Sequence, residues 1–413
     1  MKRGYLSEYF EGIGMKRIRA VEADVLHSNQ HEFNGVTGFK AILGEPKDKV
    51  SYPTRFLYLG DDDQEPIAYD GFLTWYDARQ KGRIAGNTNR SEYRLYFPTS
   101  EVSNRSANGD LLVIGKRQDG TMLAVIAKGR TTSEQQLLWL FGVDEITDSM
   151  FEVKLDLEST RDEVGFAAKA ILDQIGVVVE EDAPDFLEQM LMQFGGGFPK
   201  TIVFSDFARR SLQLNPIDDP DLALVAWMER EELLFKTLER HLLSAQITEL
   251  QKVGIDTDSY MKIFMSFQQR RKSRAGSALE NHLEEIFSSH RITYTRTGVT
   301  ERGLKPDFIF PGISNYRDPQ FPATQLTMVA AKTTCKDRWR QILNEAARIP
   351  EKHLLTLEPS ISQGQTDEMR SERVQLVLPQ ALHETYAEKQ RGWLMSLADL
   401  LAIAKARQSA PLH

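Results

Sequence analysis

Short apolar runs separated by polar turns fill the first 150 residues, and this alternation predicts mainly β structure. The runs expected to form strands are 35–44, 54–59, 72–76, 93–97, 110–114 and 122–127. Between the last two runs stands Asp119-Gly120, a dipeptide typical of the tight turn of a β-hairpin. Several short strands joined by polar turns favour a barrel or a sandwich.

From about Ser133 the apolar period lengthens to three or four residues, which indicates helices. Thr132-Ser133-Glu134-Gln135 precedes the apolar run 137–140 and is typical of a helix start. Further helices are expected at 158–178, 184–194, 219–244, 256–270, from Ser277 onward, and at 393–407. The run Gly195-Gly196-Gly197 is interpreted as a flexible turn, because no Lys-Ser/Thr pair follows it as in a phosphate-binding loop.

A chain of 413 residues is too long for one ordinary core, so we expect several domains. The predicted boundaries are a β-rich domain at 1–165, a helical connecting region at 166–214 and an α/β domain at 215–413. No apolar run approaches the ~20 residues that span a bilayer, and the N-terminus lacks the apolar region of a signal peptide. A single cysteine, Cys335, agrees with a reducing cytoplasm, so a cytoplasmic protein is expected.

The formal net charge of −8 argues mildly against a protein coated in nucleic acid. It does not exclude an enzyme that reads a DNA sequence, because local basic patches can lie on an acidic body. Net charge therefore does not decide the function.

The residues with candidate chemistry lie between 305 and 345. Asp307 opens the short apolar strand 308–310, and Lys332 ends the strand 326–331. Hydrolysis of a phosphodiester needs an activated water and a cation that absorbs negative charge. Mg²⁺ takes oxygen ligands, usually from a few carboxylates with waters. Asp307 is thus the first candidate ligand, and Lys332 is a candidate to position the attacking water or help to deprotonate it.

A Pro-Asp pair followed later by a lysine resembles the PD-(D/E)xK nuclease superfamily, but the position two before Lys332, normally acidic, is Ala330. A charged helix expected from Asp337 to Arg348 offers a replacement for the missing acid. On that helix Glu345 shares a face with other residues at spacings of three, four and seven, namely Arg338, Gln341 and Ile342. Glu345 is therefore the candidate second acidic ligand.

Two further side chains admit a functional and a structural interpretation. Glu280, early in the helix that begins at Ser277, is a carboxylate that could complete a second metal site or lie on a solvated helix face. Cys335 has no histidine nearby in the sequence and is interpreted as a small buried residue.

Three segments resemble the catalytic domain of EcoRII-type restriction endonucleases: 270–276, 305–308 and above all 332–346, which begins Lys-Thr-Thr-Cys-Lys-Asp-Arg-Trp-Arg-Gln. The likeness extends from about Asn215 to the region 376–379, and more loosely to the C-terminus. The resemblance implies a restriction-endonuclease-like α/β domain with a mixed central sheet. It also implies that the second acid has moved to the following helix, so that Ala330 is expected.

The resemblance implies a catalytic core of Asp307, Lys332 and Glu345. Glu280 is an additional acid, and the metal ligands for Mg²⁺ come from the three carboxylates. Tyr316 also falls on a position of the family's active region, although a loop aromatic that only packs on the domain explains it equally well.

Base recognition is implied for the next segment. Lys336, Asp337 and Arg338 match the family's segment that reads CC:GG base edges, and their chemistry suits that role because Arg and Lys donate to guanine while Asp accepts from cytosine. Arg340 is a candidate phosphate contact. The basic run that contains Arg271, Lys272 and Arg274 is either a solvated helix end or, as the resemblance favours, a set of phosphate-backbone contacts.

The N-terminal part resembles, more weakly, the B3-like pseudobarrel that binds a second DNA site in two-domain enzymes of this type. The supporting segments are 29–35, 78–83, 89–94 and the hairpin 110–127. Arg90, Glu92 and Arg94 alternate on one predicted strand face, so they can contact base edges together. The alternative is an edge strand protected by charge.

The resemblance therefore implies a type II, Mg²⁺-dependent restriction endonuclease. Its expected target is a short double-stranded palindrome of the CCNGG or CCWGG kind, cut by a homodimer that a second DNA site activates. The functional partner is a cognate DNA methyltransferase of the same restriction-modification system, and no membrane is involved. In the alternative, the same nuclease belongs to a defence system whose N-terminal domain senses a modified base, a nucleotide signal or a protein partner. A DNA-binding protein with a decayed site is disfavoured, because Asp307, Lys332 and Glu345 are all present.

Overall fold

A computed structural model describes the chain over residues 4–24, 31–60, 66–86, 89–159, 164–179, 183–253 and 257–411. The chain forms two compact units. The N-terminal unit comprises Met1–Val179 with Ser360–Gly364, and the C-terminal unit comprises Glu180–Pro359 with Gln365–His413. The region 166–214, which the sequence suggested as a connector, is divided between them. In the part that the structure describes, no helix is long and apolar enough to cross a membrane.

The N-terminal unit is built on one mixed sheet of eight strands in the order β2-β5-β4-β3-β7-β6-β1-β8. The strands are β1 (Phe10–Arg17), β2 (Glu32–Phe33), β3 (Val50–Leu59), β4 (Ile67–Asp77), β5 (Tyr93–Tyr96), β6 (Leu111–Arg117), β7 (Met122–Ala127) and β8 (Glu152–Lys154). Strands β3 and β7 run parallel, and the other neighbours are antiparallel. The prediction of a mainly β N-terminal region is confirmed.

Most of the predicted strands are present, including the hairpin β6–β7, whose turn places Gly120 at φ 82°. The strand predicted at 35–44 is wrong, because this segment forms the 3-10 helix η2 (Val36–Phe39) followed by helix α3 (Lys40–Leu43). The buried side chains of this segment are Val36, Phe39, Ile42 and Leu43. Their spacing of three to four residues suits a helix and not a strand.

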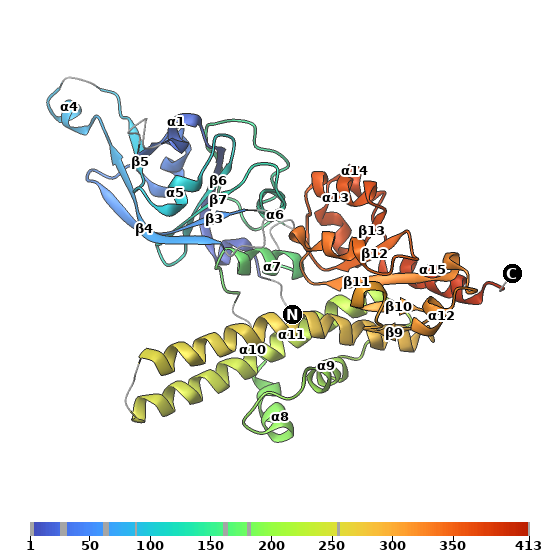
Figure 1. Cartoon of the computed structure of the whole chain (residues 1–413). Helices are drawn as coiled ribbons and strands as arrows, with labels where there is room; N and C mark the ends of the chain where they lie inside the picture. Colours follow the sequence, from blue (N-terminus) through green and yellow to red (C-terminus); the bar gives the residue numbers. More distant parts are fainter. Residues whose placement is uncertain are drawn as a thin grey trace. The chain divides into compact units, whose positions relative to one another are not determined.

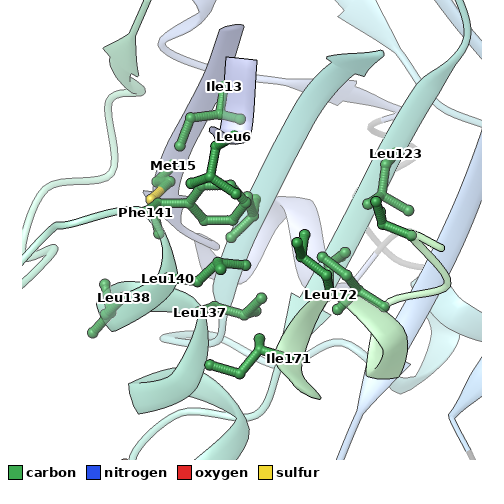
Figure 2. Close-up of a cluster of buried hydrophobic side chains, with 14 of the residues drawn as sticks. Leu6, Ile13, Met15, Leu123, Leu137, Leu138, Leu140, Phe141, Ile171 and Leu172 are labelled. Atoms are coloured by element: carbon green, nitrogen blue, oxygen red, sulfur yellow. The ribbon is translucent and has the colours of Figure 1, made fainter. Parts of the chain in front are cut away.

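Two apolar clusters cover the two faces of this sheet. Strand β7 contributes alternately to both: Leu123 and Val125 lie in one cluster, while Ala124 and Ile126 lie in the other. The first cluster is closed by helices α6 (Thr132–Leu140) and α7 (Phe166–Gln174), whose leucines and isoleucine meet the sheet (Figure 2). Shorter helical segments complete the unit: η1 (Leu6–Glu8), α1 (Ala20–Ala23), α4 (Gln80–Ile84) and α5 (Glu101–Arg105).

Four helices open the C-terminal unit: α8 (Pro184–Phe194), α9 (Thr201–Arg210), α10 (Pro220–Val253) and α11 (Thr257–Ser289). Helices α10 and α11 form a long pair lying side by side (Figure 1). The two helices expected at 256–270 and from Ser277 are one continuous helix, α11. Gly276 does not break it, since one glycine inside a helix costs only about 1 kcal/mol and buried residues on one face, Leu279, Leu283 and Phe287, continue the helical pattern.

The C-terminal unit contains a five-stranded sheet in the order β13-β12-β11-β10-β9. Its strands are β9 (Thr295–Arg296), β10 (Phe308–Phe310), β11 (Thr327–Lys332), β12 (Lys352–Thr356) and β13 (Val374–Val377). Strand β10 is antiparallel to β9 and β11, whereas β11, β12 and β13 are parallel. The predicted mixed central sheet is therefore confirmed.

The remaining helices of the chain's C-terminal half surround that sheet. They are η4 (Glu301–Gly303), α12 (Ile313–Arg317), η5 (Ala323–Gln325), η6 (Lys336–Asn344), α13 (Gln363–Ser371), η7 (Gln380–Thr385), α14 (Glu388–Arg391) and α15 (Leu397–Ser409). The last helix begins four residues later than predicted. The reason is that Ser396 acts as its N-cap and accepts a hydrogen bond from the Asp399 amide.

Candidate active site

Asp307 and Lys332 meet at the ends of two neighbouring internal strands of the C-terminal sheet, β10 and β11. Strands β10 and β11 pair antiparallel with Phe308 opposite Val329, so the residue before β10 lies beside the end of β11. The Lys332 Nζ donates to Asp307 Oδ2 at 2.8 Å, and the Ala331 amide donates to the same oxygen at 2.8 Å. The two residues that the sequence singled out are thus in direct contact.

Glu345 lies near this pair, but it is not on an α-helix as expected. The segment Lys336–Asn344 is the 3-10 helix η6, and Glu345 is its C-cap with extended backbone. In a 3-10 helix residues three apart share a face, and Trp339 and Ile342, which precede Glu345 at that spacing, are both buried. The predicted face with Arg338 and Gln341 is therefore wrong, since both of these are exposed.

The electrostatics of the three residues favour an added cation. Burial raises the pKa of the Glu345 carboxyl, and the negative charge of Asp307 raises it further, while Lys332 and Lys352 oppose the shift. Among the described residues, none donates a hydrogen bond to the Glu345 carboxylate or to Asp307 Oδ1. Two neighbouring carboxylates, of which only Asp307 is bonded to a lysine, thus have unused acceptor oxygens.

This arrangement fits a hard divalent cation. Mg²⁺ is usually held by one or two carboxylates, with waters completing its octahedron, and Asp307 with Glu345 supplies two. Within the described ranges no group of three His, Cys, Asp or Glu side chains could hold a metal ion. The expected third ligand, Glu280, is instead engaged by Arg296, whose Nε and Nη2 donate to Glu280 Oε2 at 3.0 and 2.7 Å.

Tyr316 lies in α12 and is buried. Its hydroxyl donates to both carboxylate oxygens of Glu301 at 2.6 Å and accepts from the Arg348 amide at 3.3 Å. Burial, and then the hydrogen bond to Glu301, raise the pKa of Tyr316 to about 12. The geometry favours a packing role over a proton-transfer role.

The segment after Lys332 presents some of the predicted base-reading residues. Arg338 is exposed, while Arg340 is exposed and pairs with Glu368. The side chains of Lys336 and Asp337 lie outside the described residues. Cys335 is buried as predicted, and burial raises the pKa of its thiol well above the usual value.

The basic run of α11 differs from the expected exposed patch. Arg274 is buried, with its guanidinium 4.5 Å from the Phe204 ring centre and 4.9 Å from that of Phe235. Arg271 pairs with Glu239, with Nη2 and Oε2 2.5 Å apart, and the side chain of Lys272 lies outside the described residues. The reason is that the run lies inside a long helix packed on α9 and α10, and not at a helix end. Arg274 is therefore not available as a phosphate contact in this structure.

In the N-terminal unit, Arg94 lies within β5, whereas Arg90 and Glu92 precede that strand. The expected alternation of all three on one strand is therefore wrong. Arg94 donates to Glu32 and to Glu92, and Glu92 also pairs with Arg79. These contacts make a paired surface network. The supporting residues Asn29 and Gln30 lie outside the described residues.

Two residues beside the site were not singled out from the sequence. Lys352 opens β12 and is only 5% exposed, and Glu301 accepts from Tyr316. The sequence does contain a sign of Lys352, which is a lysine at the start of an apolar strand. A lysine at such a position is expected to be buried, and a buried ammonium needs hydrogen-bond acceptors.

Comparison with known proteins identifies the region around this site. Residues 235–401 match the family described as EcoRII C terminal. The chain is 43% identical over 186 residues to the type II restriction enzyme EcoRII of Escherichia coli, which is 45% of each protein. It is 26% identical over 150 residues to the type II restriction enzyme SsoII of Shigella sonnei, 34% of this chain and 48% of that enzyme. The chain thus spans about half the length of the curated relatives that it matches.

Among solved structures, the chain is similar to metal-depleted Ecl18kI in complex with uncleaved, modified DNA, with a TM-score of 0.43, 19% identity and coverage of 56% of this chain and 88% of that one. The complex of restriction endonuclease PspGI with substrate DNA gives a TM-score of 0.39, 15% identity and coverage of 57% and 94%. The resemblance stated from the sequence motifs is confirmed by the family match over residues 235–401 and by the identity to EcoRII.

Proposed function

We propose that this chain is a type II site-specific deoxyribonuclease that hydrolyses phosphodiester bonds of double-stranded DNA. The proposal is supported by the contact of Lys332 with Asp307 at the ends of β10 and β11, with the Glu345 carboxyl close enough for the charges of both to act on it. The identity of 43% to a type II restriction enzyme over 186 residues supports it. Because the likeness spans only part of that enzyme, activity, target and partners are all proposals.

In the proposed mechanism, Asp307 and Glu345 hold Mg²⁺ through the carboxylate oxygens that accept no hydrogen bond from the described residues. When bound there, the ion supplies an activated water and absorbs negative charge on the phosphate. Glu280 does not join these ligands in the proposal, because Arg296 occupies its carboxylate.

Lys332 contributes a positive charge at the same place. Its ammonium donates to Asp307 Oδ2 and so fixes the orientation of that carboxylate. The remaining N–H groups of the ammonium can donate to the attacking water or to a phosphate oxygen. The proposed role of Lys332 is therefore to orient Asp307 and the water and to stabilise developing charge.

We assign base reading to the segment that begins at Lys336. Arg338 is exposed and can donate to guanine O6 and N7 in the major groove. Together with Lys336 and Asp337 it suits a short palindrome containing CC and GG, of the CCNGG or CCWGG kind. Arg340, stacked near the Trp339 ring at 4.7 Å, is proposed as a phosphate contact.

For the N-terminal part we propose a B3-like pseudobarrel, residues 1–165, that binds a second copy of the target and activates cleavage by the catalytic domain at 215–413. Its proposed DNA contacts are Arg90, Glu92 and Arg94. The active species is proposed to be a homodimer, and the functional partner a DNA methyltransferase of the same system. A sensor for a modified base, a nucleotide signal or a protein is not favoured.

Plasmids with no, one or two CCNGG or CCWGG sites test this function. In Mg²⁺ the wild-type protein is expected to cut two-site plasmid fast and one-site plasmid slowly, and to leave site-free plasmid intact. Chelator and the variant Lys332→Ala are the negative controls. No cutting of any such plasmid by folded wild-type protein would contradict the proposed target class, and equal rates on one and two sites would contradict activation by a second site.

A further inference from the structure

The turn that follows η6 holds Glu345 in place and has an unusual backbone. Ala346 adopts φ 47°, a left-handed conformation that non-glycine residues rarely take. The Ile349 amide donates to the Ala346 carbonyl at 2.9 Å and closes the turn. A residue in this conformation persists only where its surroundings hold it. The contacts that hold this turn therefore determine where the Glu345 carboxylate lies.

On the carbonyl side the turn is held by Lys352. Its Nζ donates to the Ile349 carbonyl at 2.6 Å and to the Ala346 carbonyl at 3.0 Å. Lys352 is 5% exposed and is fixed at the start of β12, which pairs with the strand that ends at Lys332. A buried ammonium with two backbone acceptors is a rigid anchor, because losing either bond leaves a polar group unsatisfied.

On the amide side the same turn is held by Glu301 and Tyr316. The Ala347 amide donates to Glu301 Oε2 at 3.4 Å, and the Arg348 amide donates to the Tyr316 hydroxyl at 3.3 Å. The Tyr316 hydroxyl in turn donates to Glu301. The amides of Ala347 and Arg348 and the carbonyls of Ala346 and Ile349 thus all have side-chain partners.

We infer that Lys352 is a positioning residue for Glu345. By anchoring the turn at Ala346 and Ile349 it orients the Glu345 carboxylate toward the cation site. Glu301 and Tyr316 support the same turn from its amide side. The inference rests on the proposed role of Glu345 as a metal ligand. Residues that orient a ligand without touching the metal typically change metal affinity or activity by about 10- to 100-fold when removed.

The test measures metal binding without DNA, so that it does not depend on cleavage. Mn²⁺ is titrated into full-length protein, and the free ion is followed by electron paramagnetic resonance. Lys352→Met is expected to weaken Mn²⁺ binding by about 10- to 100-fold, in the same direction as Glu345→Gln. The same variant is expected to need a higher Mg²⁺ concentration for half-maximal cleavage, with part of the lost kcat restored at high Mg²⁺.

A matched control separates positioning from general destabilisation. Arg391 is also a cation that donates to two backbone carbonyls, those of Tyr386 and Glu384, at 2.8 and 2.9 Å. Arg391→Met is expected to leave the Mn²⁺ affinity unchanged. If Lys352→Met does not fold, Tyr316→Phe loosens the same turn from the amide side and is expected to weaken Mn²⁺ binding by a smaller factor.

Folded Lys352→Met with wild-type Mn²⁺ affinity would overturn the inference, and so would unchanged affinity in Tyr316→Phe if the lysine variant is unfolded. A failure of the proposed function gives a different pattern. In that case the wild type cuts no DNA, yet Lys352→Met and Glu345→Gln still weaken Mn²⁺ binding together.

Discussion

Two groups of charged side chains, fully buried in the N-terminal unit and half-buried in the C-terminal unit, are built in opposite ways. In the N-terminal unit Lys16 and Glu22 are both fully buried and form a one-to-one pair at 2.6 Å. Both oxygens of Glu22 are used, since Oε1 also accepts from the Asn34 amide at 2.6 Å and Oε2 from the Arg19 amide at 2.9 Å. This group is balanced in charge and in hydrogen bonds.

In the C-terminal unit the corresponding group is unbalanced. Lys332 pairs with Asp307, whereas the Glu345 carboxylate accepts no hydrogen bond from the described residues, and burial with the nearby Asp307 raises its pKa. Buried charges are normally paired and hydrogen-bonded, and departures from such rules concentrate at functional sites. The difference fits a structural role for the first group and the proposed cation site for the second.

The largest expected effect is on catalysis. Lys332→Ala should reduce the cleavage rate by about 10²–10⁴-fold while specific DNA binding remains, because the lysine acts at the reacting phosphate and not at the bases. Cleavage kinetics and gel-shift binding on the same oligonucleotide measure both quantities. Undiminished cleavage would show that the lysine is misassigned.

The largest effect on the free energy of unfolding is expected at the Lys16–Glu22 pair. Glu22→Gln leaves the Lys16 ammonium buried without a counter-charge and should lower the free energy of unfolding by about 3–5 kcal/mol. Urea unfolding followed by circular dichroism measures the loss. Glu345→Gln is the matched variant in the unbalanced group and should not destabilise the metal-free protein. A comparable loss of unfolding free energy in Glu22→Gln and Glu345→Gln would contradict the different roles given to the two charged groups.

A smaller effect is expected at the base-reading segment. Arg338→Ala should lower discrimination at one base pair by about 1–3 kcal/mol, since it removes donors to guanine without disturbing the carboxylates. Relative cleavage rates on a set of single-base target variants measure this discrimination. An unchanged cleavage spectrum would count against the proposed readout.

The pH dependence of stability should differ between wild type and Glu345→Gln. Because the folded pKa of Glu345 lies above its ordinary value of 4.5, its protonated form favours folding. That contribution is present below the ordinary pKa and is lost as pH rises through the raised pKa. In chelator, Glu345→Gln should therefore gain stability relative to wild type between pH 4.5 and neutral pH, as urea unfolding at several pH values can show. A difference in unfolding free energy between the two proteins that does not change with pH would contradict the raised pKa of Glu345.

Much of the C-terminal architecture could be predicted from the sequence. The strands around Asp307 and Lys332 are short, apolar and bounded by polar residues, and their antiparallel pairing brings the two side chains together. The sequence also predicted that Glu345 lies near this pair, but not the backbone conformation that carries it. A spacing of three, as between Trp339 and Ile342, occurs on one face of both kinds of helix, so a 3-10 helix was taken for an α-helix.

The other errors have one physical origin, which is tertiary packing that a local pattern does not reveal. In the sequence Arg274 belongs to a basic run that was expected to be exposed. In the structure aromatic rings of α9 and α10 cover it. Glu280 looks like a free carboxylate until β9 brings Arg296 to it. Lys352 looks like an ordinary strand residue until the turn after η6 supplies two carbonyl acceptors.

The most direct test of the central claim is thermal unfolding of wild type and Glu345→Gln, without DNA, in chelator and in excess Mg²⁺. A ligand that binds only the folded state raises the melting temperature in proportion to the logarithm of its excess over Kd. Mg²⁺ is expected to raise the melting temperature of the wild type and not that of Glu345→Gln. An equal rise in both proteins, or no rise in the wild type at saturating Mg²⁺, would contradict it.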